Sequence, residues 1–127
     1  MSAEHKKHNP GFLALVDDAK SRIRQVTIDD LARMLAEKEQ FVLVDVREES
    51  EWAAGHPAGA IHLSKGIIER EIETVAPDKA AKMVLCCGGG YRSALSADSL
   101  QRMGYTNVVS LVGGWRAYQA AGLPVEK

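Results

Sequence analysis

The chain has 127 residues, of which 46% are hydrophobic, so it can bury the core of one compact domain without a metal or disulfide framework. Its 16 basic and 17 acidic residues nearly cancel, which excludes the strongly basic surface of a nucleic-acid-binding or membrane-surface protein. Residues 1–10 are polar, no apolar run approaches the roughly 20 residues that span a bilayer, and the only cysteines are one adjacent pair, so we expect a cytoplasmic protein.

Helical spacing of apolar residues begins after Pro10 and Gly11 and recurs along the chain. Thr27 is typical of an N-cap, because Asp30 stands three residues later and an apolar stripe follows. Gly104 is typical of the residue that closes a helix. The predicted helices span residues 12–23, 28–35, 48–54, 67–75, 92–103 and 115–121.

Short apolar runs between these helices predict strands at 41–46, 60–63, 83–86 and 107–111. The run at 41–46 is almost continuously apolar, which indicates burial on both faces. Strands that alternate with helices predict an α/β fold, in which helices flank both faces of a mostly parallel central sheet in a three-layer sandwich. We divide the chain into an N-terminal extension with a helix, residues 1–25, and a domain, residues 26–127.

The segment with the clearest chemistry follows the strand predicted at 83–86 and ends where a helix begins. It reads Cys86-Cys87-Gly88-Gly89-Gly90-Tyr91-Arg92-Ser93. Parallel sheets bind ligands at the carboxyl ends of their strands, where this segment lies. Its glycines let backbone N–H groups curl inward, and the helix start adds unpaired N–H groups of its own. The sequence therefore predicts an anion cradle with a cysteine at its mouth.

Such a cradle favours the ionised cysteine. A free thiol has a pKa near 8.5, and lowering it by about two units would make the thiolate the dominant form at neutral pH. Arg92 adds a fixed cation whose fork suits an oxyanion such as thiosulfate. On spacing alone, either cysteine could be the nucleophile. Counted from Cys86, the segment is Cys-x5-Arg-Ser, which is the pattern of cysteine-dependent phosphatases. Counted from Cys87, it is Cys-x4-Arg, which is one residue shorter.

Three blocks of sequence, in the right order, resemble the rhodanese family. The first runs from Leu43-Val44-Asp45-Val46-Arg47-Glu48 through Glu51-Trp52 to Gly55-His56-Pro57-Ala58-Gly59-Ala60-Ile61. The second is Val84-Leu85-Cys86-Cys87-Gly88-Gly89-Gly90-Tyr91-Arg92-Ser93-Ala94. The third runs from Val109-Ser110-Leu111-Val112-Gly113-Gly114-Trp115 to Gly122-Leu123-Pro124-Val125. The resemblance extends from about Val26 to Val125.

The resemblance implies a rhodanese-type thiosulfate sulfurtransferase without metal or organic cofactor. It places the family's sulfur-bearing cysteine on Cys87 and its loop arginine on Arg92, with substrate-binding loop residues Gly88, Gly89, Gly90 and Tyr91. A sulfane sulfur would pass from a donor such as thiosulfate, through a persulfide on Cys87, to cyanide or a thiol, including a protein thiol such as thioredoxin. The glycine loop lacks the side-chain charge that often follows the cysteine in thiosulfate-using members.

Two alternatives stand beside this interpretation. One is a cysteine-dependent phosphatase that uses Cys86, and the other is a non-catalytic rhodanese-like binding module. Retention of both the loop cysteine and Arg92 argues against the binding module. We expect Cys86 to be inert packing, since the family does not need a cysteine at that position.

The remaining polar and aromatic candidates are interpreted as structural. Asp45 and Arg47 are expected to form a structural pair. We expect Lys65 to be solvated. The histidines are expected in a solvated tail or in structural positions, and the tryptophans in the core: His5, His8, His56, His62, Trp52 and Trp115.

Overall fold

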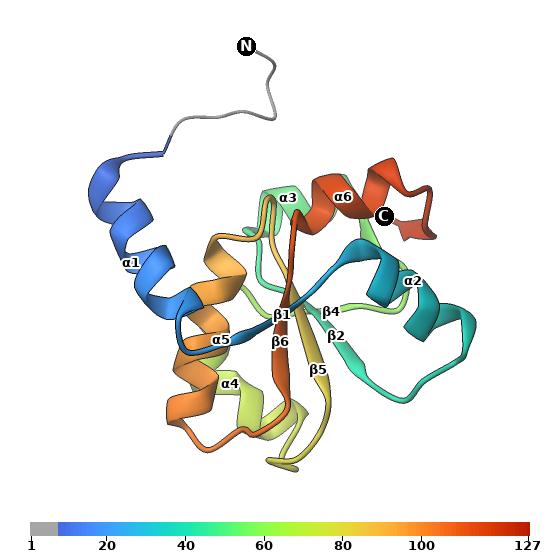
Figure 1. The fold of residues 1–127 in the computed structure, drawn as a ribbon. Helices are drawn as coiled ribbons and strands as arrows, with labels where there is room; N and C mark the ends of the chain where they lie inside the picture. Colours follow the sequence, from blue (N-terminus) through green and yellow to red (C-terminus); the bar gives the residue numbers. More distant parts are fainter. Residues whose placement is uncertain (1–7) are drawn as a thin grey trace.

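The computed structural model of the chain describes residues 8–127, which form a parallel sheet with helices on both faces (Figure 1). The sheet has the strand order β1-β6-β5-β2-β4, and every neighbouring pair in it is parallel. A second, antiparallel pair joins β3 to β7. The strands are β1 (Arg24–Val26), β2 (Val42–Asp45), β3 (His56–Pro57), β4 (Ile61–His62), β5 (Met83–Cys86), β6 (Val108–Leu111) and β7 (Val125–Glu126).

Helices cover the two faces of the sheet and its carboxyl end. They are α1 (Pro10–Lys20), α2 (Ile28–Ala36), α3 (Glu49–Ala54), α4 (Ile68–Val75), α5 (Arg92–Arg102) and α6 (Gly114–Ala120). One buried cluster joins the sheet to α4 and α5, and a second joins it to α2 and α6. Because successive strand residues point to opposite faces, Leu85 belongs to the first cluster, and Val84 and Cys86 belong to the second. This burial on both faces explains the continuous apolar runs of the central strands.

The predicted fold class is confirmed, and so are all six predicted helices and the four predicted strands, with shifts of a few residues at their ends. Thr27 caps α2 as expected: its side chain accepts from the backbone N–H of Asp30, whose carboxylate accepts from the N–H of Thr27 in return. Strands β1, β3 and β7 were not predicted. They have two or three residues each, and β1 and β7 are largely exposed, so no apolar run marks them.

Helix α1 lies against α5 (Figure 1). Val16 and Ala19 of α1 are buried. Arg22, which follows the helix, forms a bidentate ion pair with Asp98 of α5, with N···O distances of 2.8 and 3.1 Å. The chain then continues into β1 at the edge of the sheet. The segment from Pro10 to Val26 is therefore fixed to the rest of the fold. Within residues 8–127, no helix is long and apolar enough to cross a membrane.

Candidate active site

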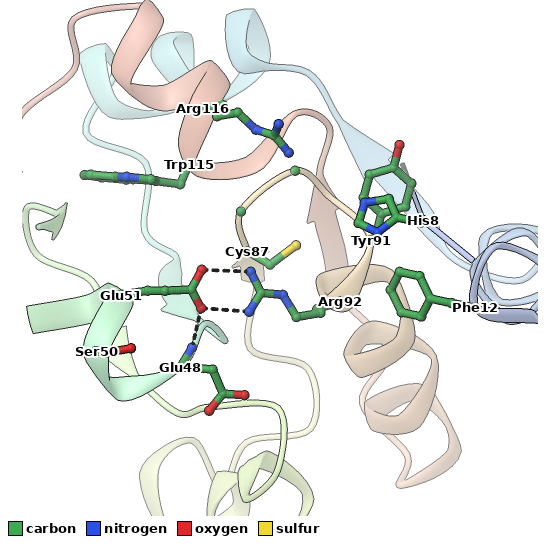
Figure 2. A pocket seen from close by; sticks show the side chains of 12 residues that line it. His8, Phe12, Glu48, Ser50, Glu51, Cys87, Tyr91, Arg92, Trp115 and Arg116 are labelled. Carbon is green, nitrogen blue, oxygen red and sulfur yellow. Dashed lines mark hydrogen bonds and ion pairs between the residues drawn. The ribbon is translucent and has the colours of Figure 1, made fainter. Parts of the chain in front are cut away.

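The loop from Cys87 to Tyr91 connects the end of β5 to the start of α5, at the carboxyl edge of the sheet. A cavity of about 710 Å³ opens above it, and side chains from α1, α3, α5 and α6 line this cavity (Figure 2). Of the predicted site residues, Cys87, Gly88, Gly89, Tyr91 and Arg92 line the cavity. Gly90 does not line the cavity, and it is buried.

The sulfur of Cys87 lies in a set of hydrogen-bonding groups. The backbone N–H of Gly90 donates to Sγ at 3.1 Å, and the thiol donates to the hydroxyl of Ser93 at 3.4 Å. The Ser93 hydroxyl also shares a hydrogen bond of 2.7 Å with that of Ser110 on β6. Both serines are fully buried, so this pair of hydroxyls is held in place. The N–H of Gly90 can stabilise negative charge on this sulfur, and the Ser93 hydroxyl can donate to it once the thiol has lost its proton.

Two of the loop glycines leave room for arginine side chains. A Cβ on Gly88 would lie 2.9 Å from Nη2 of Arg92, and a Cβ on Gly89 would collide with the guanidinium of Arg116. Gly90 has a different role, since its φ is +97° and its backbone packs against that of Gly113. Two guanidinium groups therefore lie close to a loop that has no charged side chain at positions 88–90.

Arg92 is held by Glu51 of α3 in a bidentate ion pair, with N···O distances of 2.8 and 3.1 Å (Figure 2). Glu51 also accepts a hydrogen bond from the backbone N–H of Glu48, which caps α3. The Arg92 guanidinium holds the pKa of the Glu51 carboxyl below its usual value, despite the opposing effect of partial burial. Sequence reasoning missed Glu51, although a carboxylate three residues after an N-cap position is a recognisable capping signal.

Replacing Glu51 with glutamine should remove a pH-dependent part of the stability. The folded-state pKa of Glu51 is depressed, so the ion pair stabilises fully above the unfolded-state pKa of about 4.5, and this stabilisation disappears as the pH falls through the lower folded-state pKa. The difference in Tm between wild type and Glu51→Gln should therefore be constant near neutral pH and shrink below about pH 4.5. Thermal melts of both proteins from neutral pH to below pH 4.5 measure this difference in Tm. A difference that stays constant into acid would contradict the pairing.

Cys86 lies on the opposite side of the backbone from the cavity. It is fully buried in the cluster formed with α2 and α6, and its Sγ contacts only the carbonyl of Cys87 at hydrogen-bonding distance. Burial raises the pKa of its thiol strongly. The expectation that Cys86 packs in the core is confirmed, and its thiol does not line the cavity.

Helix α6 supplies two lining residues at its first turn. The backbone N–H of Trp115 donates to the carbonyl of Cys87 at 2.6 Å, and that of Arg116 donates to the carbonyl of Gly88 at 3.3 Å. The approach is so close that a Cβ on Gly114 would collide with the Cys87 carbonyl. The prediction that Trp115 belongs to the core is wrong in part, because its ring is half-buried and lines the cavity. Arg116 was not predicted, since nothing local to it indicates a site.

Helix α1 and the segment just before it supply two more residues that line the cavity. The prediction of a solvated His8 is wrong: His8 and Phe12 lie beside the ring of Tyr91 and line the cavity. This contact joins residues that are about eighty positions apart, so local sequence could not reveal it. His5 lies outside the described residues.

Trp52 was expected in the core, but it is only partly buried and stacks on the ring of His56. The expectations for the following residues hold. Asp45 and Arg47 form a fully buried ion pair at 2.8 Å beneath the site. Ring nitrogens of His56 and His62 lie 2.9 and 2.8 Å from backbone carbonyls, those of Trp52 and Arg47. Lys65 does not line the cavity. Among residues 8–127, no three His, Cys, Asp or Glu side chains lie close enough to hold a metal ion.

Comparison with known proteins gives the same family as the three sequence blocks. The model of the rhodanese-like domain matches residues 27–121. A sulfurtransferase of Allochromatium vinosum is 30% identical over 103 residues, which cover 81% of this chain and 94% of the relative. Thiosulfate sulfurtransferase GlpE of Actinobacillus pleuropneumoniae is 32% identical over 92 residues, covering 72% of this chain and 83% of GlpE.

A solved structure from Rhodopseudomonas palustris superimposes with a TM-score of 0.82 and is 31% identical, covering 95% of this chain and 98% of that one. That protein is described as one of unknown function and a possible tyrosine phosphatase. The family match spans most of the chain, and the cysteine loop, the fold and the sulfurtransferase relatives agree with it. The chain belongs to the rhodanese-like domain family.

Proposed function

We propose that the protein is a sulfurtransferase that carries a sulfane sulfur as a persulfide on Cys87. The observation that carries this proposal is the position of the Cys87 sulfur. It accepts the N–H of Gly90 at 3.1 Å, beneath a cavity that two guanidinium groups line. A sulfur in this position is stabilised as an anion and has room above it for a donor.

The reaction takes two half-steps. The Cys87 thiolate attacks the outer sulfur of thiosulfate, a new S–S bond forms at Sγ, and the S–S bond of thiosulfate breaks as sulfite leaves with the electron pair. Cyanide or a thiol, such as that of thioredoxin, then attacks the outer sulfur of the persulfide and regenerates the thiolate. Arg92 and Arg116 line the cavity, where their guanidinium groups can bind the oxygens of the donor. Both cysteines are free thiols, so the sulfur of Cys87 is available to react.

The main rival is phosphate ester hydrolysis, which the description of the Rhodopseudomonas palustris protein raises. A phosphatase with the Cys86-x5-Arg frame needs the thiolate of Cys86, and that sulfur is buried on the far face with a raised pKa. The loop that starts at Cys87 reaches Arg92 one residue sooner than the phosphatase pattern. A shorter loop forms a smaller cradle, which favours a single sulfur over a phosphoryl group.

Steady-state kinetics distinguish these functions. With thiosulfate as donor and cyanide as acceptor, the initial rates should give parallel double-reciprocal lines, because the enzyme alternates between thiolate and persulfide. The same preparation should not hydrolyse p-nitrophenyl phosphate. Intersecting lines, or phosphate ester hydrolysis that outpaces sulfur transfer, would overturn the proposal.

A further inference from the structure

An aromatic wall, formed by His8, Phe12 and Tyr91, stands on one side of the cavity (Figure 2). The ring of Tyr91 lies 4.5 Å from that of His8 and 6.3 Å from that of Phe12, and His8 and Phe12 are 5.2 Å apart, centroid to centroid. Trp115 lines the cavity on the other side, and Cys87 lies between the two in Figure 2. Aromatic rings therefore flank the reacting sulfur on two sides.

The aromatic wall is anchored. Helix α1, which carries Phe12, is held against α5 by the buried residues Val16 and Ala19. The ammonium of Lys20, at the end of α1, lies 5.2 Å from the centre of the Tyr91 ring. Phe12 thus occupies a fixed position relative to the start of α5, and no rearrangement is needed to form the wall.

The size and charge of the cavity leave room for a donor that is larger and less charged than thiosulfate. Its volume of about 710 Å³ falls in the range of sites for organic ligands, which are mainly lined by apolar and aromatic side chains. The carboxylates of Glu48 and Glu51 line the same cavity as the guanidinium groups of Arg92 and Arg116. A donor with a single negative charge and an apolar group suits this mixture better than thiosulfate does.

We propose that the aromatic wall binds the organic group of the sulfur donor, so that the protein prefers a monoanionic sulfane-sulfur donor that carries an aromatic group. This inference rests on the proposed function and adds the class of donor. The Cys87 thiolate attacks the outer sulfur of such a donor, R–SO₂–S⁻. The Sγ–S bond forms, the S–S bond of the donor breaks, and the sulfinate R–SO₂⁻ leaves with the electron pair. The R group packs against Phe12 and His8 throughout.

A pair of matched donors tests the wall. Benzenethiosulfonate and methanethiosulfonate share their charge and reacting atoms and differ in the ring. The measurement is the ratio of their kcat/KM values in each variant, because comparing ratios between variants cancels their intrinsic difference in reactivity. Phe12→Ala should lower the benzene-to-methane ratio about 3- to 10-fold, as expected for the loss of one ring contact. His8→Ala should lower it in the same direction.

Two controls make the result specific. Leu15→Ala removes an apolar side chain that is 62% exposed on the same helix and does not line the cavity, so it should leave the ratio unchanged. Phe12→Leu keeps an apolar side chain on the helix without the ring, and it should also lower the ratio. Equal ratios in wild type, Phe12→Ala and Leu15→Ala would overturn the inference.

A binding measurement separates this inference from the proposed function. Benzenesulfinate, the leaving group, can be titrated into the protein and followed by tryptophan fluorescence, since Trp115 lines the cavity and no turnover is needed. Its affinity should fall in Phe12→Ala and stay unchanged in Leu15→Ala. If this pattern appears but neither thiosulfonate transfers sulfur, the aromatic site stands and the proposed function fails. If sulfur is transferred but the affinity for benzenesulfinate does not depend on Phe12, the proposed function stands and the aromatic site fails.

Discussion

Replacing Cys87 with serine should abolish sulfur transfer, whereas replacing Cys86 with alanine should leave it intact. Serine has no sulfur on which a persulfide can form, so turnover with thiosulfate and cyanide should fall by at least about 10³-fold. Cys86 packs among apolar side chains between the sheet and helices α2 and α6, and it does not line the cavity. Its truncation removes one buried sulfur and should cost about 1 kcal/mol of stability.

The two variants control for one another, because they alter adjacent positions at the end of the same strand. Their Tm values establish that each is folded before its turnover is compared with wild type. Loss of activity in a folded Cys86→Ala protein, with activity retained in Cys87→Ser, would assign the chemistry to the cysteine on the far face and contradict the geometry described above.

The largest loss of stability is expected from Asp45→Ala. Asp45 is fully buried, and it accepts three hydrogen bonds from the side chain of Arg47, which is 3% exposed. Removing the carboxylate leaves a buried cation without its counter-charge, which costs about 3–5 kcal/mol. Since domains of this size are stable by only about 5–15 kcal/mol, the variant should unfold at a much lower denaturant concentration.

Two further variants test why Asp45→Ala loses stability. Arg70→Ala breaks an exposed ion pair with Glu71 and should change the free energy of unfolding by less than about 1 kcal/mol. A double variant, Asp45→Leu with Arg47→Met, replaces both charges with apolar side chains and should recover much of the stability. If the double variant is as unstable as Asp45→Ala, the loss of stability does not come from the unpaired charge of Arg47. The ion pair itself would then stabilise the fold.

The sheet and its flanking helices could be predicted because their signals are local. The apolar run at 41–46 and the Thr27 cap each depend on residues within one element. The face of the sheet on which each cysteine lies also follows from sequence, since alternation along β5 places Cys86 and Cys87 on opposite sides. The loop from Cys87 to Tyr91 could be predicted for the same reason, as its strand, glycines and helix start are contiguous.

The rest of the cavity is assembled from distant segments and carries no local signal. Phe12 meets Tyr91 only because α1 packs on α5, and Arg116 reaches Gly89 only because α6 begins against the Cys87 carbonyl. The sequence identifies Arg92 as the cation of the loop, but its bidentate partner Glu51 comes from another helix. Tertiary packing therefore decides the electrostatics and the shape of the site, which is why the donor class could not be inferred from the loop alone.

The persulfide on Cys87 is tested most directly by intact mass spectrometry of thiosulfate-treated protein. Wild type and Cys86→Ala should each gain one sulfur atom, Cys87→Ser should gain none, and cyanide should remove the added sulfur with release of thiocyanate. Sulfur that is retained by Cys87→Ser, or absent from wild type when both thiosulfate and an organic thiosulfonate are offered, would contradict the assignment of Cys87 as the sulfur carrier.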